Sequence, residues 1–289
     1  MSTTVDLWSK DKMQANQAKV ILVTGASSGM GKDGTLRLIR DRHIVYGVAR
    51  RRDRMRDIVE VGGHALEMDV TDPASINKAV AQVIAEQGRI DVLWNNAGFS
   101  VTGAVEDVSS EDARRQFEVN LFGVAEITKA VLPQMRKQKS GLIINTSSVG
   151  GKIFTPLGAW YHASKHALEG WSDCLRLELA PFNINVVILE PGGVKSEFGD
   201  VMYEPLLARA RGGAYEAMTK SVAASFSKNY APSNTRLSDP SVVSDVVAKV
   251  VASRKPRTRY AVGYGSKTVL FMRWLLSDRL FGRLISSQF

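Results

Sequence analysis

The feature that most constrains the fold is an alternation of short apolar runs with helical patterns between residues 20 and 190. A short, uninterrupted apolar run is typical of a strand buried on both faces of a parallel sheet. Such runs are found at residues 20–23, 43–49, 66–68, 90–94, 142–145 and 185–189. Helical patterns extend to about residue 41, over residues 71–87, over residues 110–137 and to about residue 179. The alternation predicts an α/β fold with a doubly wound parallel sheet, right-handed crossovers and helices on both faces.

Length and composition favour a soluble globular protein with one large core. The chain has 289 residues, of which 44% are hydrophobic and 23% are charged. Its single cysteine, Cys174, excludes an intrachain disulfide and fits a reducing, cytoplasmic setting. No apolar run is long enough to span a bilayer, and residues 1–18 lack the apolar centre of a signal peptide. We therefore expect a flexible leader over residues 1–18, with Met13 as an alternative start, and a single domain over residues 19–265.

A glycine-rich turn joins the first expected strand to the first expected helix. Residues 24–31 read TGASSGMG, which has the glycine spacing G-x-x-x-G-x-G. Glycines allow a tight turn and a close approach of the backbone to a pyrophosphate. The N-terminus of the following helix presents free N–H groups to the anion. Because a strand and a helix flank the turn as this mechanism requires, we expect a dinucleotide to bind here.

The end of the second expected strand indicates which dinucleotide binds. The adenosine ribose lies at this edge in a dinucleotide fold, and an Asp or Glu there would repel a 2′-phosphate. This chain has Ala49 followed by Arg50 and Arg51, while Asp53 comes later. A guanidinium suits a phosphate, so we expect NADP(H), with NAD(H) as the alternative.

The net charge of +9 admits other interpretations of the five arginines between residues 50 and 56. A solvated surface and a polyanion site are the alternatives to a phosphate-bearing cofactor. Neither a nucleic-acid fold motif nor interleaved aromatic residues accompany the arginines. We therefore expect no nucleic-acid partner.

Two asparagine-containing features follow the fourth expected strand. Residues 95–98 read NNAG and form a polar turn at the carboxyl end of the strand, where ligands bind in this architecture. An ordinary Asn-rich turn is the alternative. Asn120 lies inside the long helical pattern, although an asparagine side chain competes with the backbone for hydrogen bonds. It marks either a local break with a purpose or a tolerated polar residue.

The segment from residue 145 to residue 165 contains side chains suited to proton transfer. Tyr161 and Lys165 are spaced i, i+4, which places them on one face of a helix. A free phenol is a poor acid or base at neutral pH, and a fixed ammonium beside it favours the phenolate. The pair can then exchange a proton with a substrate oxygen, which the hydroxyl of Ser148 can hold. Because Y-x-x-x-K is a common pattern, the pair alone is also compatible with an ordinary surface helix.

The last third of the chain has a different character. Residues 196–237 are polar, rich in Ala, Ser and Lys, and weakly patterned, so we expect a mobile, partly helical lid. Asp239 and Pro240 predict the N-cap and first residue of a helix that ends near residue 253. Residues 259–262 fit a seventh strand.

Residues 266–289 form an apolar and basic helical tail. Four charged residues interrupt its apolar stretch, which makes the stretch too charged to span a bilayer. We expect the tail to make an oligomer contact or to form a wall of the pocket. Packing in the core and binding to a membrane surface are the alternatives.

Taken together, these residues resemble the short-chain dehydrogenase/reductase family, in its shorter branch, over roughly residues 19–200. The six motifs occur in the family's order and spacing: TGASSGMG at 24–31, DV at 69–70, NNAG at 95–98, Asn120, Ser148 with YHASK at 161–165, and PGGV at 191–194. The resemblance implies a Rossmann-type sheet of about seven strands in the order 3-2-1-4-5-6-7. It also makes residues 19–265 a dinucleotide-binding catalytic domain. Within the family, the N-terminal half and the tail are most similar to carbonyl, retinol and 17β-hydroxysteroid reductases.

The resemblance further implies a role for each matched position. Tyr161 would be the catalytic acid/base, and Ser148 would hydrogen-bond the substrate oxygen. Lys165 would support Tyr161 and bind the nicotinamide ribose, and Asn120 would hold a water that links Lys165 to solvent. The implied cofactor-binding residues are Gly25, Ser27, Ser28, Gly29, Met30, Gly31, Arg50, Arg51, Asp69, Val70, Asn96, Ala97, Gly98, Tyr161, Lys165, Pro191, Gly192, Val194 and Ser196.

Two of these positions depart from the family's usual residues. Ser196 stands where family members usually carry threonine, and its hydroxyl preserves the expected contact with the carboxamide. Ser28 stands where many NADP-dependent members carry a basic residue. The preference for NADP(H) therefore depends on Arg50, and Arg51 is the alternative ligand of the 2′-phosphate.

The sequence thus predicts an NADP-dependent oxidoreductase that reduces a ketone or aldehyde, with oxidation of a steroid or retinol alcohol as the alternative direction. Aromatic and apolar residues beside the motifs predict a fairly apolar pocket: Phe99, Phe154, Trp160, Met202 and Tyr203. The substrate is a small molecule. Family members often pack their long helices into dimers or tetramers, so a homo-oligomer is expected.

Three other hypotheses about the function of the chain are disfavoured. A dehydratase or epimerase of the extended branch is disfavoured by the glycine spacing and the chain length. A cofactor-bound sensor or scaffold without activity is disfavoured because the four catalytic positions are all present. His162 and His166 have a spacing that can bind zinc, but no third ligand accompanies them, so we expect no metal.

Overall fold

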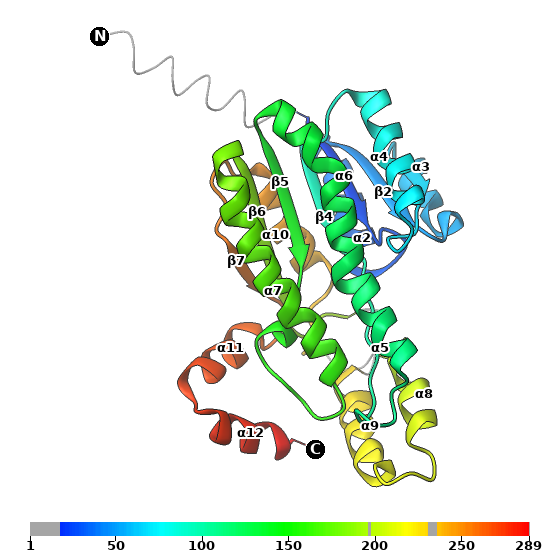
Figure 1. Ribbon diagram of the computed structural model, residues 1–289, viewed down its shortest axis with the longest axis vertical. Coiled ribbons are helices and arrows are strands. Elements are labelled where there is room, and N and C mark those ends of the chain that lie inside the picture. The colour runs from blue at the N-terminus through cyan, green and yellow to red at the C-terminus, as the bar shows by residue number, and fades with distance from the viewer. Residues whose placement is uncertain (1–17, 196–197, 231–235, 289) are drawn as a thin grey trace.

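The fold is built on one parallel sheet. The computed structural model describes residues 18–195, 198–230 and 236–288. Seven parallel strands lie in the order β3-β2-β1-β4-β5-β6-β7 (Figure 1). They are β1 (Val20–Thr24), β2 (Ile44–Ala49), β3 (His64–Glu67), β4 (Val92–Asn95), β5 (Gly141–Thr146), β6 (Ile184–Pro191) and β7 (Arg259–Val262). The predicted Rossmann-type order is confirmed, and the seventh strand lies where the sequence predicted it.

Helices cover both faces of the sheet. They are α2 (Gly29–Arg40), α3 (Arg56–Glu60), α4 (Pro73–Gln87), α5 (Ser110–Phe117), α6 (Gly123–Gln138), α7 (Ala159–Leu179), α8 (Phe198–Ala210), α9 (Glu216–Tyr230), α10 (Ser241–Ala252), α11 (Ser266–Leu275) and α12 (Asp278–Ser286). In Figure 1, α4, α6 and α7 lie in front of the sheet, and α10 lies behind it. Within the described residues, no helix is both long enough and apolar enough to cross a bilayer.

The alternation of side chains along β1 explains the two layers of helices. Ile21 and Val23 belong to a core shared with α2 and α10, whereas Val20 and Leu22 belong to a core shared with α4, α6 and α7. Successive side chains of a strand point to opposite faces, so every second residue enters the same core. An uninterrupted apolar run is the sequence pattern of such a strand.

Local signals place the helix ends that the sequence predicted. Asp72 is the N-cap of α4 and accepts a hydrogen bond from the Ala74 N–H at 2.9 Å, with Pro73 as the first helical residue. At the other end, Gly88 adopts the left-handed conformation that stops the helix. One boundary differs, because α10 begins at Ser241, just after the predicted start at Pro240.

The helix predicted over residues 110–137 is interrupted. A π-helical turn, Glu118–Phe122, separates α5 from α6. The Gly123 N–H donates to the Glu118 carbonyl, five residues earlier, instead of four. Asn120 lies inside this turn and is buried. Of the two alternatives for Asn120, the structure therefore selects a local break.

The last third of the chain adds helices beyond the carboxyl ends of the strands. Helices α8 and α9 lie against each other and share a small core that includes Leu206 and Val222. The described part of residues 196–237 is therefore largely helical, while the mobile lid stays a prediction. Helices α11 and α12 form a second pair, which lies below α7 in Figure 1.

Candidate active site

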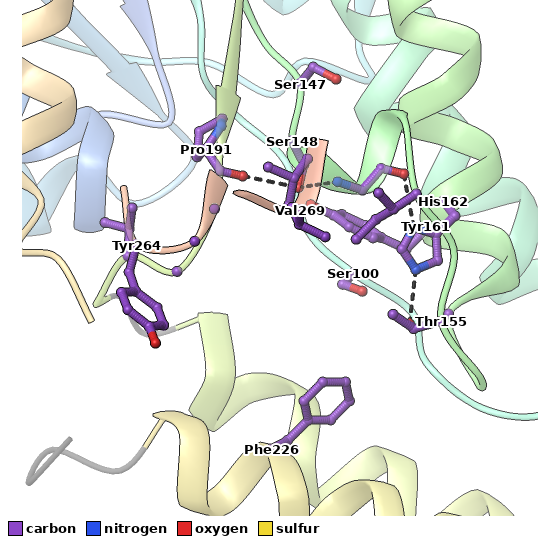
Figure 2. A pocket seen from close by; sticks show the side chains of 18 of the residues that line it. Ser100, Ser147, Ser148, Thr155, Tyr161, His162, Pro191, Phe226, Tyr264 and Val269 are labelled. Carbon is purple, nitrogen blue, oxygen red and sulfur yellow. Dashed lines mark hydrogen bonds between the residues drawn. The ribbon is translucent and has the colours of Figure 1, made fainter. Parts of the chain in front are cut away.

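A cavity of about 380 Å³ lies beyond the carboxyl ends of the central strands. The glycine-rich turn contributes Met30, the loop after β5 contributes Ser148, and α7 contributes Tyr161. Pro191, Gly192 and Val194, at the end of β6 and just after it, form another wall, and α9 and α11 contribute Phe226 and Val269 (Figure 2). Parallel α/β sheets bind their ligands at this end of the strands.

Ser148 is held beside Tyr161 by the loop that follows β5. Its Oγ accepts a hydrogen bond from the Gly150 N–H at 3.0 Å and donates to the Pro191 carbonyl at 3.4 Å. The second contact is long, so the hydroxyl proton is only loosely held. A Cβ placed on Gly150 would lie 3.0 Å from Tyr161 Cε1 and 3.3 Å from Ser148 Oγ. The absence of a side chain at this position lets the serine and the tyrosine face one opening.

Lys165 is buried one helical turn after Tyr161. Its Nζ donates to the Thr146 carbonyl at the end of β5 at 2.9 Å. Burial lowers the pKa of Lys165 to about 8, and the carboxylate of Glu169 opposes this effect. The protonation of Lys165 therefore depends on two opposing effects: burial disfavours the ammonium, and the carboxylate of Glu169 favours it.

Glu169 belongs to a buried ionic cluster that joins α7 to the last two strands. Its carboxylate lies 3.0 Å from Lys152 Nζ and 3.1 Å from Arg259 Nε, and Arg259 also contacts Asp173 and Glu190. Burial raises the pKa of Glu190, with neighbouring Glu169 acting in the same direction. Arg259 lies in β7, so the last strand of the sheet fixes the carboxylate whose charge acts on Lys165.

Asn120 is held in place near Gly98, which also adjoins Lys165. Its Oδ1 accepts from the Phe99 N–H at 3.1 Å, and its Nδ2 donates to the Phe99 carbonyl at 3.0 Å and to Ser164 Oγ at 3.2 Å. A Cβ on Gly98 would lie 3.2 Å from Asn120 Oδ1 and 3.6 Å from Lys165 Nζ. The NNAG turn, the π-helical turn and the lysine therefore meet around Gly98.

The glycine-rich turn is packed against the NNAG turn. Gly25 has a φ of +69°, and a Cβ there would lie 2.8 Å from Ala97 Cα. A Cβ on Gly31 would lie 2.3 Å from Asn96 Nδ2 and 2.4 Å from the Gly25 carbonyl oxygen. The side chain of Asn96 donates to the Thr24 carbonyl at 3.2 Å. Glycine at these positions is required for the two turns to approach each other.

The start of α2 fits the pyrophosphate of a dinucleotide. Ser28 is the N-cap residue, but its side chain makes no capping hydrogen bond, and the first turn contains no acidic residue. The N–H groups of this turn and the positive end of the helix dipole are therefore open to an anion. Ser27, Gly29 and Met30 lie on the same turn, so all the predicted residues between 25 and 31 are gathered here.

The predicted adenosine side of the site lies at the ends of β2 and β3. Arg50 and Arg51 follow β2 directly and are exposed. The Gly25 N–H donates to the Val48 carbonyl at 2.9 Å, which ties the glycine-rich turn to this strand end. Asp69 Oδ1 accepts from the N–H and the hydroxyl of Thr71, which fixes the Asp69–Val70 turn.

Ser196 is the one predicted site residue that lies outside the described residues. The other predicted residues are all placed at this end of the sheet.

The structure corrects the prediction of which aromatic residues line the pocket. Phe99 and Trp160 pack into a separate small core with Val101 and Val108. Phe154 packs edge-on against Phe281 of α12, with ring centroids 5.4 Å apart. None of these three lines the cavity, because each turns its ring toward a neighbouring element. The side chains of Met202 and Tyr203 lie outside the described residues.

His162 is a cavity residue that the sequence analysis weighed only as a metal ligand. Its Nδ1 lies 2.8 Å from the Gly150 carbonyl, so this nitrogen carries the proton and donates. Its Nε2 lies 3.0 Å from Thr155 Oγ1 and accepts from that hydroxyl. Burial lowers the pKa of His162, which favours the neutral ring. The histidine thus clamps the loop over residues 150–158 onto α7. Within the described chain, no group of three or more His, Cys, Asp or Glu side chains is arranged to hold a metal ion.

Comparison with known proteins finds close relatives of this chain. The profile of the family described as short chain dehydrogenase matches residues 19–205. A 3-ketodihydrosphingosine reductase of Bacteroides thetaiotaomicron is 46% identical over 184 residues, which cover 64% of this chain and 67% of the relative.

Solved structures share the same fold. A short-chain dehydrogenase from Streptomyces avermitilis is 34% identical, with a TM-score of 0.76 over 93% of this chain and 96% of the other. A serine dehydrogenase in complex with NADP+ is 31% identical, with a TM-score of 0.69 over 80% and 88% of the two chains. A xylitol dehydrogenase bound to NAD+ is 30% identical, with a TM-score of 0.69 over 81% and 92%.

Proposed function

The chain belongs to the short-chain dehydrogenase/reductase family, and from that premise we propose that it is an NADP-dependent oxidoreductase that reduces a ketone or aldehyde to an alcohol. One observation carries the proposal: the side chains of Ser148 and Tyr161 line a single cavity together with Met30 of the glycine-rich turn. A proton donor and a second hydroxyl therefore stand beside a turn suited to a dinucleotide.

The reaction divides between the cofactor and the side chains of the cavity. Bound NADPH would supply a hydride to the carbonyl carbon. Tyr161 would donate its phenolic proton to the carbonyl oxygen, and Ser148 would donate a hydrogen bond to the same oxygen. The ammonium of Lys165 would stabilise the phenolate that remains. Oxidation of an alcohol, as in a steroid or retinol dehydrogenase, would be the reverse sequence.

Asn120 would act through the π-helical turn. Its side-chain amide already bonds both backbone groups of Phe99 and the hydroxyl of Ser164. The backbone of the turn is therefore the group that we propose to hold a water between Lys165 and solvent. Through this water the tyrosine would regain its proton.

The lining of the cavity supports an apolar substrate. Apolar side chains supply much of the wall, among them Val149, Ile153 and Val269. Ser100 and Thr102 are also lining residues, and their hydroxyl oxygens are buried without a hydrogen-bond partner within the described residues. A long-chain ketone would suit the apolar part of this wall. The similarity to a 3-ketodihydrosphingosine reductase makes that compound the first substrate to test.

The reaction is tested by following NADPH and NADH oxidation with ketones, aldehydes, steroids and 3-ketodihydrosphingosine. We expect Tyr161→Phe to lower turnover by at least about a hundredfold while NADPH binding is kept, because only the proton donor is removed. Near wild-type turnover of this variant would contradict the assigned mechanism. Tight NADPH binding without turnover of any substrate would favour the alternative of a sensor or scaffold.

Cofactor preference is tested by Arg50→Asp, with Arg52→Asp as the matched control. Both residues are exposed arginines, and Arg50 follows β2 directly. We expect Arg50→Asp to raise the KM for NADPH by about tenfold or more and to favour NADH, because a carboxylate repels a 2′-phosphate. An unchanged NADPH-to-NADH ratio in Arg50→Asp, with a changed ratio in Arg51→Asp, would assign the phosphate to Arg51.

We further propose that residues 196–237 close over the substrate. Support comes from Phe226 of α9, which lines the cavity across from Ser148 and Tyr161. Residues 1–18 would be a leader outside the catalytic domain, and the cytoplasm is the proposed location, since one cysteine suits a reducing compartment.

A further inference from the structure

The tail is fixed to the body of the protein by one side of α11 and α12. Val269 and Met272 of α11 pack against Ile153, Phe281 and Ile285. The guanidinium of Arg273 lies 5.7 Å from the Phe154 ring and 5.6 Å from the Phe281 ring, and it pairs with Asp278 at 2.7 Å. The inner face of the tail is therefore fully engaged.

The outer face of the tail is also apolar, yet it is exposed. Trp274 is 78% exposed, and Phe271, Leu275 and Leu280 are 55%, 56% and 51% exposed. The rings of Phe271 and Trp274 touch, with centroids 5.9 Å apart. We call these four exposed residues of α11 and α12 the tail patch. Exposed apolar residues gathered on one segment are of the kind that mark an interaction surface. Figure 1 shows α11 and α12 standing clear of the sheet at the edge of the molecule.

Positive charge accompanies the tail patch. Residues 264–288 contain four basic residues and one acidic residue, which gives a net charge of +3. Asp278 is already paired with Arg273, and Lys267, Arg279 and Arg283 are exposed. Lys267 lies one turn before Phe271 on α11, and Arg279 is adjacent to Leu280 on α12. Apolar and basic side chains are thus interleaved along both helices.

The charge of the tail favours an anionic bilayer over a second copy of the chain as the partner of the tail patch. A second copy related by a two-fold axis would bring the same patch against itself, so its basic residues would face one another. An anionic bilayer instead complements these charges, and each basic residue near its surface strengthens binding. Tryptophan and phenylalanine side chains are common at the boundary between headgroups and acyl chains.

We propose that the tail patch docks on the surface of an anionic phospholipid bilayer. Apolar side chains of α11 and α12 enter the boundary between headgroups and acyl chains, while Lys267, Arg279 and Arg283 contact lipid phosphates. The segment that carries the patch also lines the cavity, through Tyr264, Gly265 and Val269. Docking therefore places the cavity next to the lipid from which an apolar substrate is drawn. Only this last consequence rests on the proposed function.

The test is flotation of the full-length protein with vesicles of phosphatidylcholine, with and without phosphatidylserine. We expect binding to the anionic vesicles that weakens as salt is raised. Arg279→Glu with Arg283→Glu should weaken binding by at least about tenfold. The matched control, Lys78→Glu with Lys137→Glu, changes the same charge on exposed positions of α4 and α6 and should bind almost as the wild type does.

The apolar part of the patch has its own variants. Phe271→Ser with Trp274→Ser should reduce binding to the same vesicles by at least about tenfold, because the rings no longer enter the bilayer. Val105→Ser removes an exposed apolar side chain elsewhere and should have no effect. Far-ultraviolet circular dichroism and NADPH binding verify that each variant is folded.

Three results would overturn the proposal. The first is absence of wild-type binding to anionic vesicles. The second is binding that the tail variants and the controls weaken equally. The third is a wild-type assembly that dissociates in the tail variants without any vesicle binding, which would assign the patch to a second copy. Because flotation needs no substrate, this experiment tests membrane docking independently of the reductase activity.

Discussion

At the scale of single residues, the charge of Lys165 depends on one carboxylate. Glu169 lies one turn further along α7 and raises the pKa that burial lowers to about 8. Lys152 and Arg259 hold this carboxylate in place. The group proposed to support Tyr161 is thus tuned by a residue that lies outside the cavity lining.

Glu169→Gln should move the pH dependence of the reaction. Without the carboxylate, the pKa of Lys165 falls further, so the lysine loses its proton at a lower pH. Activity that requires the ammonium disappears as pH rises through the lysine pKa. The alkaline limb of kcat/KM should therefore shift downward by about one pH unit. Asp173→Asn is the matched control, since Asp173 also pairs with Arg259 but is not among the charges that shift Lys165. Equal shifts in both variants would show that the whole cluster acts only as structural support.

The sequence was sufficient to propose the catalytic positions but not to predict their surroundings. Tyr161 and Lys165 are one turn apart on any helix, so their pairing follows from spacing alone. The contact of Glu169 with Arg259 joins residues on α7 and β7 that are far apart in the chain, and it depends on β7 docking beside β6. His162 had a local signal in its position next to Tyr161, but its partners lie in a loop whose course the sequence does not specify.

At the scale of elements, the fit between the glycine-rich turn and the NNAG turn is the tightest contact of the site. Both turns are connections at the carboxyl ends of neighbouring strands, β1 and β4. Their approach is limited by the backbone of Ala97 at Gly25 and by the side-chain amide of Asn96 at Gly31. The two turns meet because β1 and β4 are adjacent parallel strands, whose carboxyl ends lie at the same edge of the sheet.

Two glycine-to-alanine changes should have opposite effects on stability. In Gly31→Ala the new methyl would overlap Asn96 Nδ2 and the Gly25 carbonyl, so we expect a loss of about 3 kcal/mol in the free energy of unfolding and of NADPH binding. In Gly170→Ala the new methyl lies at an exposed position of α7 and meets nothing within 4 Å. We therefore expect the free energy of unfolding to increase by about 1 kcal/mol. Urea unfolding measures both. Unchanged stability and cofactor binding in Gly31→Ala would show that the two turns do not need this close approach.

The π-helical turn could be suspected but not predicted. An asparagine within an apolar helical pattern was compatible with either a break or an ordinary helix. The break becomes evident only when Asn120 is seen to bond both backbone groups of Phe99, which anchors the loop after β4 to the helix.

At the scale of the whole molecule, the order of the sheet was predictable and the walls of the cavity were not. Continuous apolar runs and crossover rules predicted a doubly wound parallel sheet, and the family resemblance supplied the order of its strands. Phe99, Phe154 and Trp160 lie beside the motifs in sequence. Phe99 and Trp160 pack into a neighbouring core, and Phe154 packs edge-on against Phe281. The cavity instead receives Phe226 and Val269 from the weakly patterned last third, where sequence gives little guidance.

The expected homo-oligomer belongs to this scale too. Leu177 of α7 is 65% exposed on the helix layer that the family resemblance assigns to subunit contacts. We expect sedimentation velocity to show a dimer or tetramer that Leu177→Asp weakens by at least about tenfold, since a buried carboxylate would need a partner. Val105→Asp, at another exposed apolar position, should leave the assembly intact. A wild-type monomer at every concentration would contradict the expectation.

The composition of the cavity wall has a consequence for how such a protein can diverge. Every group proposed to handle a proton is encoded before residue 166, whereas Phe226, Tyr264 and Val269 come from the final quarter of the chain. A recombination point shortly after β6 would exchange the second set and leave the first untouched. Descendants of one ancestor can thus acquire new substrates, or a new location in the cell, while they inherit the same reaction.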